Sequence, residues 1–360
     1  MASWKGGCIT MSNGQEPIVS CRGLRKWFPV SAGFFSQLMG GEVWLKAVDG
    51  VDLDIYPEEL YCLAGESGCG KTTTGKLLIG LLEPTDGIVE FEGHDLNEIS
   101  RGGLRTLRAR MQTIFQDPYS SLNPRLSLYD TVSEPLRLNK IATSGEDEEA
   151  RVIRALEAVQ LVPPEEFTFR YPHELSGGQR QRVAIARAIV VNPAFIVADE
   201  PVSMLDVSIR SEILNLLENI RREFHIAYIY VTHDLSVASY IGDKIAIMYL
   251  GKIMEKGTIK EVIHNAVHPY SQALISAVPS PDPTVDRKRK ILPGEPGSPI
   301  NTPPGCLFAP RCEYAQDKCR QDEPPLEEVS PGHWVSCWFP REPLQISYDL
   351  AHELKAKAKT

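Results

Sequence analysis

The sequence has no apolar run long enough to cross a membrane. A transmembrane helix needs about 18–20 consecutive, mostly apolar residues, and no stretch of the 360 residues approaches that length. Residues 1–15 also lack the apolar centre of a secretory signal peptide. We therefore expect a cytoplasmic chain whose association with a membrane comes through partner proteins.

Positive charge is also in short supply. The chain has 38 Lys and Arg residues against 47 Asp and Glu residues, which gives a net charge of −9. This balance argues against a protein built to coat nucleic acid. The sequence contains no internal repeat and no heptad run that would indicate a coiled coil. Its length predicts more than one domain, and its 42% hydrophobic content allows a sizeable core.

Cysteine is scattered at first and then concentrated. Of the eight cysteines in the chain, four form a local group near the C-terminus: Cys306, Cys312, Cys319 and Cys337. In a reducing compartment such a group indicates a metal or iron–sulfur site more than disulfides. The spacing differs from the paired C-x-x-C of most zinc modules, and four thiolates can hold either Zn²⁺ or a [4Fe–4S] cluster.

Apolar runs and turn signals predict an α/β core. Short continuous apolar runs at 60–64, 195–198 and 226–231 are typical of buried strands, and 72–82 and 213–224 are typical of helices. Strands that alternate with helices predict a largely parallel sheet.

Other segments surround this core. We expect strands within 17–54, interrupted by a loop at 31–42, and another strand at 88–91. Residues 101–190 are mostly helical in pattern, with an acidic linker at 145–149. Residues 245–256 predict a hairpin with Gly251 and Lys252 as its two-residue turn. After residue 259 proline becomes dense and a basic run follows at 287–290, which indicates a separate C-terminal extension.

A glycine-rich loop at 65–72 lies between a predicted strand and a predicted helix, the context that supports a P-loop. Backbone N–H groups of such a loop converge on phosphates, and the helix N-terminus adds positive potential. Lys71 should contact the phosphates, and the Thr72 hydroxyl should bind Mg²⁺. The alternative is a glycine turn that binds nothing. The predicted nucleotide-binding residues here are Gly65, Ser67, Gly68, Gly70, Lys71, Thr72 and Thr73.

Two carboxylates end the predicted strand at 195–198. A carboxylate at the C-terminal end of a parallel strand points toward the nucleotide crevice. We expect Asp199 to hold Mg²⁺, directly or through water, and Glu200 to act as general base toward the attacking water. The alternative is a solvated acidic pair at a turn before Pro201, which the nearby P-loop disfavours.

A second anion-binding element is predicted at 175–179. Ser176 and Gln179 have the spacing of a capping box at the start of a helix. Gly177 and Gly178 leave backbone N–H groups open at that helix start. A single chain is not expected to bring this element to its own P-loop, and the alternative is an ordinary capped helix.

In order and spacing, these elements and His233 resemble the ATP-binding cassette (ABC) family. The resemblance implies an α/β P-loop NTPase fold, with a mixed RecA-like sheet, an antiparallel β subdomain and a helical subdomain at about 101–190. It divides the chain into a flexible N-terminus at 1–15, an ATP-binding domain at 16–259, a small Cys-rich extension at 260–340 and a polar tail at 341–360. The residues at 176–179 match the signature that completes the ATP site of a partner subunit in that family.

The same resemblance assigns further residues. Gln116 matches the Q-loop glutamine, which reaches Mg²⁺ and water and links the site to the transmembrane partner. Asp206 matches the D-loop aspartate, although Met204 stands where alanine is common. His233 matches the switch histidine that contacts the γ-phosphate. Phe28 is the candidate for stacking on adenine, with Trp27 as the alternative and core packing as the non-functional interpretation of either.

Residues 305–312, Cys319 and 332–337 resemble the C-terminal extension of oligopeptide and dipeptide importer ATPases. In that family the extension can hold a [4Fe–4S] cluster. We therefore expect an iron–sulfur cluster ahead of zinc, with unligated thiols as the remaining alternative.

Residues 46–51 and 115–125 are similar to the F-type ATPase of peptide importers. There, two ATPases pair beneath two permease subunits, fed by an extracytoplasmic solute-binding protein. The resemblance implies ATP hydrolysis coupled to di- or oligopeptide import, at the cytoplasmic face of the inner membrane and with no nucleic-acid partner. It leaves a homodimer or heterodimer open, and nickel, glutathione or oligosaccharide as alternative solutes.

Three rival functions are weaker. Soluble ABC proteins of translation or DNA repair typically carry two cassettes or a long coiled-coil insertion, whereas this sequence has one cassette and no heptad run. An exporter is disfavoured because exporter cassettes are often fused to membrane segments. A regulatory iron–sulfur sensor would need a redox-active cluster.

Overall fold

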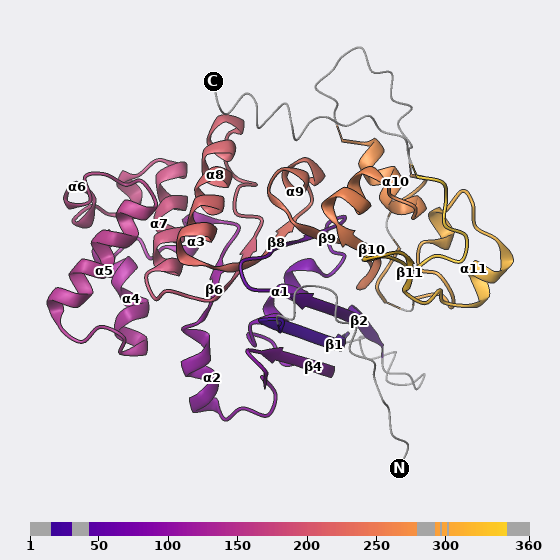
Figure 1. Ribbon diagram of the computed structural model, residues 1–360, viewed down its shortest axis with the longest axis horizontal. Helices are drawn as coiled ribbons and strands as arrows, with labels where there is room; N and C mark the ends of the chain where they lie inside the picture. Colours follow the sequence, from indigo (N-terminus) through magenta and orange to yellow (C-terminus); the bar gives the residue numbers. More distant parts are fainter. Residues whose placement is uncertain (1–15, 31–42, 279–291, 296, 301, 344–360) are drawn as a thin grey trace.

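The computed structural model describes residues 16–30, 43–278, 292–295, 297–300 and 302–343 (Figure 1). The loop predicted at 31–42, the basic run at 287–290, the N-terminal segment 1–15 and most of the tail at 341–360 lie outside these residues. Within the described part of the chain, no helix is long and apolar enough to cross a membrane. The division into domains stays a prediction.

The centre of the molecule is an eight-stranded mixed sheet with the order β11-β12-β10-β9-β3-β8-β7-β6. The five strands from β9 to β6 are parallel, as the alternation of apolar runs and helices predicts. The other three strands are antiparallel to their neighbours. The bounds are β3 Leu60–Ala64, β6 Met111–Ile114, β7 Phe195–Asp199, β8 Ala227–Thr232, β9 Lys244–Tyr249, β10 Lys252–Thr258, β11 Glu327–Ser330 and β12 His333–Val335.

Strand β3 shows why a continuous apolar run is needed in this sheet. All five of its residues are buried, because both faces of the sheet are covered. Leu60, Cys62 and Ala64 belong to one core cluster, whereas Tyr61 and Leu63 belong to the cluster on the opposite face. The period-two alternation of side chains therefore divides one strand between two cores.

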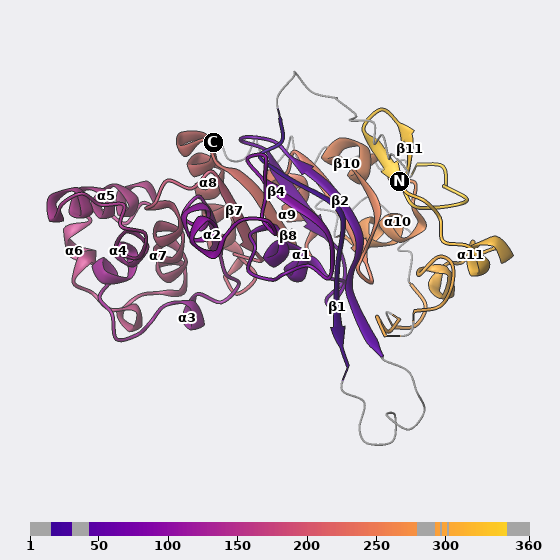
Figure 2. The same ribbon diagram turned by 90° about the horizontal axis from the view of Figure 1, so that it is seen from below.

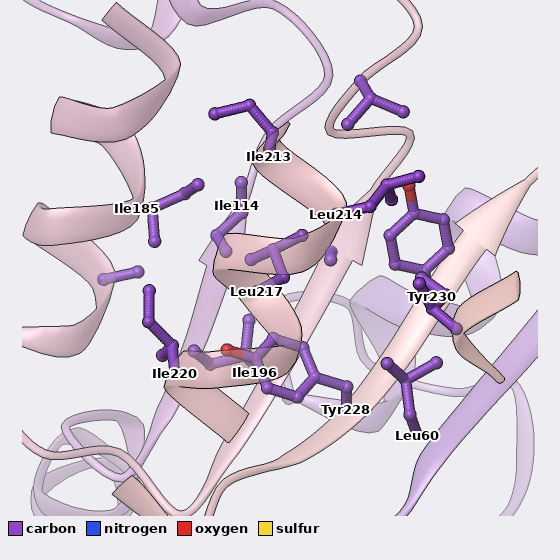
Figure 3. Packing of buried hydrophobic residues seen from close by; sticks show 14 of the residues in the cluster. Leu60, Ile114, Ile185, Ile196, Ile213, Leu214, Leu217, Ile220, Tyr228 and Tyr230 are labelled. Carbon is purple, nitrogen blue, oxygen red and sulfur yellow. The ribbon is translucent and has the colours of Figure 1, made fainter. Parts of the chain in front are cut away.

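Helix α8 (Val207–Phe224) covers one face of the sheet. Its Ile213, Leu217 and Ile220 recur at helical spacing and pack over Ile196 and other residues of the strands (Figure 3). Full burial of each such side chain contributes about 1.5–3 kcal/mol. The adjacent helix α9 (Leu235–Ile241) contributes to the same core.

A second, antiparallel sheet has the order β2-β1-β4-β5. Its strands are β1 Val19–Pro29, β2 Trp44–Ile55, β4 Asp86–Phe91 and β5 His94–Asp95. Helix α1 (Lys71–Leu78) packs in one core cluster with residues of both sheets. Helix α1 ends earlier than the helix predicted at 72–82, because the chain turns at Gly80, whose φ is 63°.

The helical region lies at the opposite end of the molecule from the C-terminal extension (Figures 1 and 2). Its helices are α3 Pro118–Ser121, α4 Leu128–Asn139, α5 Gly145–Ala158, α6 Glu165–Thr168 and α7 Gly177–Ile189, with the turn η1 Pro172–Glu174. Helix α2 (Arg101–Arg108) instead lies near the antiparallel sheet (Figure 1), and its Leu104 and Leu107 pack against that sheet's core cluster. Strand β6 interrupts the segment 101–190, which the sequence pattern predicts as mostly helical.

The acidic linker predicted at 145–149 is wrong, because these residues form the first turn of α5. Ser144 caps this helix by accepting a hydrogen bond from the N–H of Asp147. Glu146, Asp147 and Glu148 lie in the first turn, where the positive end of the helix dipole stabilises negative charge.

The predicted hairpin of β9 and β10 exists, but its turn is one residue earlier than predicted. Leu250 and Gly251 have φ values of 45° and 83°, the positive pair that a two-residue type I′ turn requires. The N–H of Gly251 donates to the carbonyl of Cys69, so this turn lies against the glycine-rich loop.

The extension adds strands β11 and β12 to the main sheet, with Glu255 of β10 opposite Val335 of β12. Its other elements are η2 Lys260–His264, α10 Pro269–Ser276, η3 Ala309–Arg311 and α11 Asp317–Gln321. Glu255 and His333 are both buried, and Nε2 of His333 lies 2.7 Å from Oε1 of Glu255. Buried ionisable groups need such partners, so this contact fixes the extension to the sheet.

Candidate nucleotide site

The predicted site residues follow neighbouring parallel strands at one edge of the sheet. The loop at 65–72 follows β3, Asp199 ends β7, His233 follows β8 and Gln116 follows β6. Because the carboxyl ends of parallel strands share an edge, residues far apart in sequence meet there.

The glycine-rich loop is packed too closely for side chains at two positions. A Cβ on Gly65, whose φ is 148°, would lie 2.3 Å from the carbonyl oxygen of Met248. A Cβ on Gly70, whose φ is 107°, would lie 2.2 Å from the carbonyl oxygen of Ala47. Gly70 immediately precedes α1, so the backbone N–H groups of the loop lie next to the helix N-terminus. A helix N-terminus favours binding of phosphate.

Lys71 lies inside this loop. Its side-chain ammonium donates hydrogen bonds to the carbonyl oxygens of Gly65 and Glu66, each at 2.9 Å, and the residue is buried. The ammonium is therefore held within the curve of the loop, where the P-loop pattern predicts phosphate contact.

Thr72 and Asp199 meet as the sequence predicts. The Thr72 hydroxyl donates to Oδ1 of Asp199 at 3.0 Å. Burial raises the pKa of Asp199, and the hydrogen bond from Thr72 partly offsets that rise. A hydroxyl and one carboxylate fit Mg²⁺, which usually takes one or two protein carboxylates and completes its octahedron with phosphate and water oxygens.

Glu200 lies between Gln116 and His233. Its Oε2 accepts a hydrogen bond from the Gln116 amide at 3.0 Å, and its Oε1 lies 2.9 Å from Nδ1 of His233. The φ of Glu200 is 46°, an uncommon value for a residue other than glycine, and backbone strain of this kind concentrates at functional sites. The carboxylate is thus oriented from both sides and can accept a proton from a water molecule.

The capping box at Ser176 is confirmed. The N–H of Gln179 donates to the Ser176 hydroxyl at 3.3 Å, and the N–H of Ser176 donates to the Gln179 side chain at 3.0 Å. Together with Gly177 and Gly178, these residues begin α7 in the helical region.

The D-loop lies beside this capping box. A Cβ on Gly177 would be 3.7 Å from the Leu205 side chain, and Asp206 is the N-cap residue of α8. Among the described hydrogen bonds, none joins 176–179 to the loop at 65–72. The structure assembles the P-loop, Asp199, Glu200, Gln116 and His233, whereas the 176–179 element begins α7 in the helical region, away from the P-loop (Figure 1).

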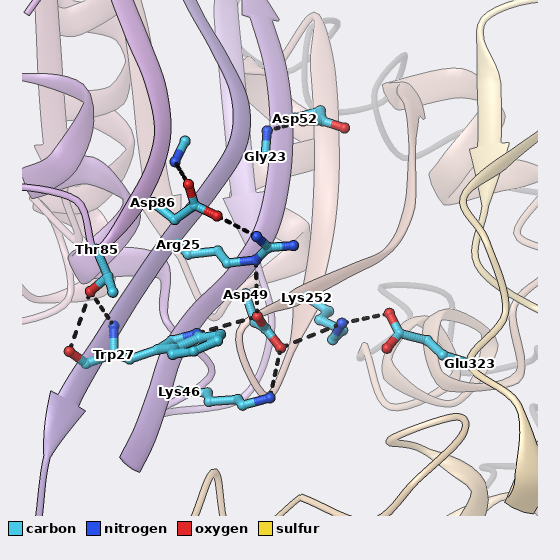
Figure 4. A network of polar contacts seen from close by, with 11 residues as sticks. Gly23, Arg25, Trp27, Lys46, Asp49, Asp52, Thr85, Asp86, Lys252 and Glu323 are labelled. Carbon is cyan, nitrogen blue, oxygen red and sulfur yellow. Dashed lines mark hydrogen bonds and ion pairs between the residues drawn. The ribbon is translucent and has the colours of Figure 1, made fainter. Parts of the chain in front are cut away.

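The two candidate aromatic residues have different surroundings. Trp27 donates its indole N–H to Asp49 at 3.2 Å, and the Lys46 ammonium lies 4.9 Å from the centre of its ring (Figure 4). Phe28 is 36% exposed at the end of β1. The Trp27 ring is committed to a polar network, which leaves Phe28 the better candidate for stacking on a base.

The expected iron–sulfur cluster is wrong, and zinc has no support either. Cys306, Cys312, Cys319 and Cys337 do line one cavity together with Phe308 and other apolar residues. Yet no three His, Cys, Asp or Glu side chains in the described ranges are placed to hold a metal ion.

Burial also favours neutral thiols in this cavity. It raises the pKa of Cys337 to about 12 and raises those of Cys306 and Cys312. Metal ligation needs thiolates. Clustering in the sequence therefore predicts that the cysteines lie together but does not predict ligand geometry.

Sequence analysis missed two residues that contact the P-loop at Glu66. The Arg311 guanidinium pairs with the Glu66 carboxylate at 2.7 and 3.2 Å, and the Tyr270 hydroxyl accepts a hydrogen bond from the Glu66 N–H at 3.1 Å. The sequence separation of Glu66 and Arg311 is 245 residues. The sequence carries no local signal that joins them.

Comparisons with known proteins agree with this geometry. The family model described as ABC transporter matches residues 48–203, and the model described as Oligopeptide/dipeptide transporter, C-terminal region, matches residues 254–319. The oligopeptide transport ATP-binding protein AppF of Bacillus subtilis strain 168 is 44% identical over 91% of this chain and 99% of its own length. The dipeptide transport ATP-binding protein DppF of Haemophilus influenzae is 42% identical over 89% of this chain and 96% of its own length.

Solved structures show the same fold. The ATP-binding cassette MJ0796, solved as a dimer in a post-hydrolysis state with ADP and Pi, is 31% identical, covers 67% of this chain and 98% of its own, and has a TM-score of 0.58. The protein cbiO1 from Clostridium perfringens, part of the ABC transporter complex cbiONQ, is 29% identical, covers 69% of this chain and 91% of its own, and has a TM-score of 0.59.

Proposed function

This chain belongs to the ABC transporter ATPases of the oligopeptide and dipeptide type, and on that basis we propose that it hydrolyses ATP to drive peptide import through permease subunits. The observation that carries the proposal is the position of Glu200. Its carboxylate lies between Gln116 and His233, next to Asp199 and Thr72, at the same edge as the P-loop.

Each residue of the nucleotide site has its own role in this reaction. Lys71 and the backbone N–H groups of the loop bind the β- and γ-phosphates, and Thr72 and Asp199 hold Mg²⁺. Mg²⁺, when bound, neutralises charge that develops on the phosphates. Glu200 accepts a proton from the attacking water, and Gln116 and His233 orient that carboxylate. Phe28 stacks on adenine.

One chain supplies only part of each working site. Ser176, Gly177, Gly178 and Gln179 lie apart from the chain's own P-loop, so they complete the ATP site of a second cassette, with Asp206 at the same interface. That second cassette is another ABC ATPase or a second copy of this chain. Binding of nucleotide between two cassettes couples ATP to their closure.

The names of the relatives support an import assembly. Two of them are named for oligopeptide and dipeptide transport. We place this chain on the cytoplasmic face of the membrane, beneath two permease subunits, with an extracytoplasmic solute-binding protein delivering a di- or oligopeptide. Nickel, glutathione and oligosaccharide remain the alternative solutes.

Co-purification and uptake test this proposal together. The tagged chain is expected to bring down two permeases and a second ATPase from gently solubilised membranes. A Lys71→Ala strain should lose uptake of labelled di- and oligopeptides, because the P-loop can no longer bind phosphates. The matched control is Lys260→Ala, which alters an exposed lysine on η2. Recovery with ribosomes or repair factors, or loss of nickel, glutathione or oligosaccharide uptake alone, would contradict peptide import.

A further inference from the structure

Among the described hydrogen bonds, those from the C-terminal extension to the nucleotide loop all meet at Glu66. Arg311 on η3 forms two charge-assisted hydrogen bonds with the Glu66 carboxylate, at 2.7 and 3.2 Å. Tyr270 on α10 accepts the Glu66 N–H at 3.1 Å. The carbonyl of Glu66 in turn accepts a hydrogen bond from Lys71. The amide, the carbonyl and the side chain of this one loop residue are thus all fixed.

Arg311 is held in position for this contact. Its side chain is only 8% exposed, and its Nε donates to the carbonyl of Pro293 at 3.2 Å. Its guanidinium also lies 5.9 Å from the centre of the Tyr249 ring. A partly buried, two-pronged arginine–carboxylate contact has fixed geometry as well as strength. The guanidinium therefore acts as a rigid support and not as a loose surface charge.

Tyr270 is held equally firmly. It is fully buried, and its ring packs against Tyr249 at 4.9 Å and Phe308 at 5.3 Å between centroids. Tyr249 ends β9, whereas Phe308 belongs to the extension. This aromatic group connects the extension to the sheet and leaves the Tyr270 hydroxyl facing the loop.

We propose that Arg311 and Tyr270 are positioning residues for ATP binding, through which the extension holds the P-loop in its binding conformation. This inference rests on the proposed function of the same site. A loop that is held in place before binding does not lose conformational freedom when it binds, so affinity is higher. Arg311 has a second effect, because it neutralises a carboxylate in a loop that must accept phosphates.

Both effects make a specific prediction for substitutions. Arg311→Met keeps most of the apolar stem but leaves Glu66 unpaired, so nucleotide affinity should fall about tenfold as the competent loop conformation becomes rarer. Adding Glu66→Gln removes the uncompensated charge, so the double variant should bind nucleotide more tightly than Arg311→Met alone. Two residues in direct contact are expected to show such non-additivity. Arg311→Lys keeps the charge but not the two-pronged geometry, so its nucleotide affinity should lie between those of the unmodified chain and Arg311→Met.

The test is titration of the full-length chain with Mg²⁺ and the non-hydrolysable analogue AMP-PNP, followed by ATPase kinetics in the assembled importer. The matched control is Arg320→Met, which removes an exposed arginine of α11 that pairs with Asp317 and should leave affinity unchanged. Because Arg311 does not touch the reacting atoms, KM for ATP should rise while kcat changes less than about twofold.

The outcomes separate the two claims. If the unmodified chain fails to bind AMP-PNP, the proposed function fails. If it binds AMP-PNP but Arg311→Met binds equally well, the positioning role is overturned. A double variant that binds as weakly as Arg311→Met would overturn the charge argument. Should Arg311→Met fail to fold, Arg311→Lys tests the same contact, and unchanged nucleotide affinity in Arg311→Lys would also overturn the positioning role.

Discussion

Glu200 illustrates how a single side chain is prepared for chemistry by its surroundings. Its carboxylate is only 16% exposed and has a partner at each oxygen, Gln116 on one side and His233 on the other. Its backbone N–H donates to the carbonyl of Val231 on the neighbouring strand, which anchors the positive φ. A carboxylate fixed in this way has little freedom to lose when it takes a proton from water.

Replacement of Glu200 by glutamine should separate binding from turnover. The amide keeps the size and the hydrogen-bonding capacity of the side chain but cannot accept the proton, and loss of a general base typically costs about 10²–10⁴-fold in rate. We expect ATPase activity to fall by at least about 100-fold while affinity for ATP stays within about threefold. Steady-state kinetics and equilibrium nucleotide binding measure the two quantities. Hydrolysis at the unmodified rate would show that Glu200 is not the base.

Residues with fixed spacing could be found from the sequence, whereas contacts between distant segments could not. The P-loop, Asp199 and the capping box at Ser176 occupy short motifs whose geometry is local. Arg311 meets Glu66 only because the extension folds back on the sheet, and no short-range pattern records that contact. The cysteine group shows the converse, since closeness in sequence suggested a metal site that the folded side chains do not form.

Helix α10 illustrates the element scale, because its N-terminus depends on a buried histidine. His268 is its N-cap, and Nδ1 of the ring accepts the N–H of Tyr270 at 3.0 Å. The N–H of His268 itself donates to the buried carboxylate of Glu255 at 3.2 Å. Burial lowers the pKa of His268 from about 6.5 to about 3, so the ring is neutral and can act as an acceptor.

Stability should therefore fall on acidification. Below pH 6.5 the unfolded chain takes up a proton that the folded ring refuses until about pH 3, so stability is complete above pH 6.5 and is lost progressively between these values. At pH 5 the loss from this group is about 2 kcal/mol.

A His268→Asn variant tests this pH dependence. Its side-chain oxygen still caps α10 but does not titrate. In urea unfolding between pH 5 and 7 it should lose about 2 kcal/mol of pH-dependent stability change, and the lost slope approaches one proton, about 1.4 kcal/mol per pH unit, only near pH 5. His94→Asn, which alters an exposed histidine of β5, is the control and should keep the original slope. An unchanged slope in His268→Asn would contradict the assignment.

Elements were predicted best where burial alone determines them. Strands β3, β7 and β8 are continuous apolar runs, and the structure places each within a residue or two of its predicted range. The acidic residues at 145–149 were misread because charge was taken as a sign of a linker, whereas at the start of α5 it complements the helix dipole. The hairpin turn was misplaced because Leu250 adopts the positive φ usually left to glycine or asparagine.

At the scale of the whole molecule, the P-loop and the capping box at Ser176 belong to different regions. Figure 1 places α7 with the helical region and α1 beneath the central sheet. This separation fits the proposed arrangement, in which a second chain contacts the nucleotide through its own 176–179 element. Because the nucleotide would bind across the interface, its binding free energy contributes to dimerisation.

Association between cassettes should accordingly depend on ATP. A Glu200→Gln chain mixed with its partner ATPase, or with itself if no partner co-purifies, should elute as single chains of about 40.0 kDa in ADP and Mg²⁺. In ATP and Mg²⁺ it should elute at roughly double that mass, because the stalled hydrolysis preserves the nucleotide that links the two chains. Gel filtration with light scattering measures this mass.

A further Ser176→Ala substitution weakens the 176–179 element and should shift the mass back toward single chains. The control Ser144→Ala weakens a comparable helix cap on α5 and should leave the mass unchanged. Equal dimerisation in ADP and ATP would show that the interface forms without nucleotide and would contradict the coupling.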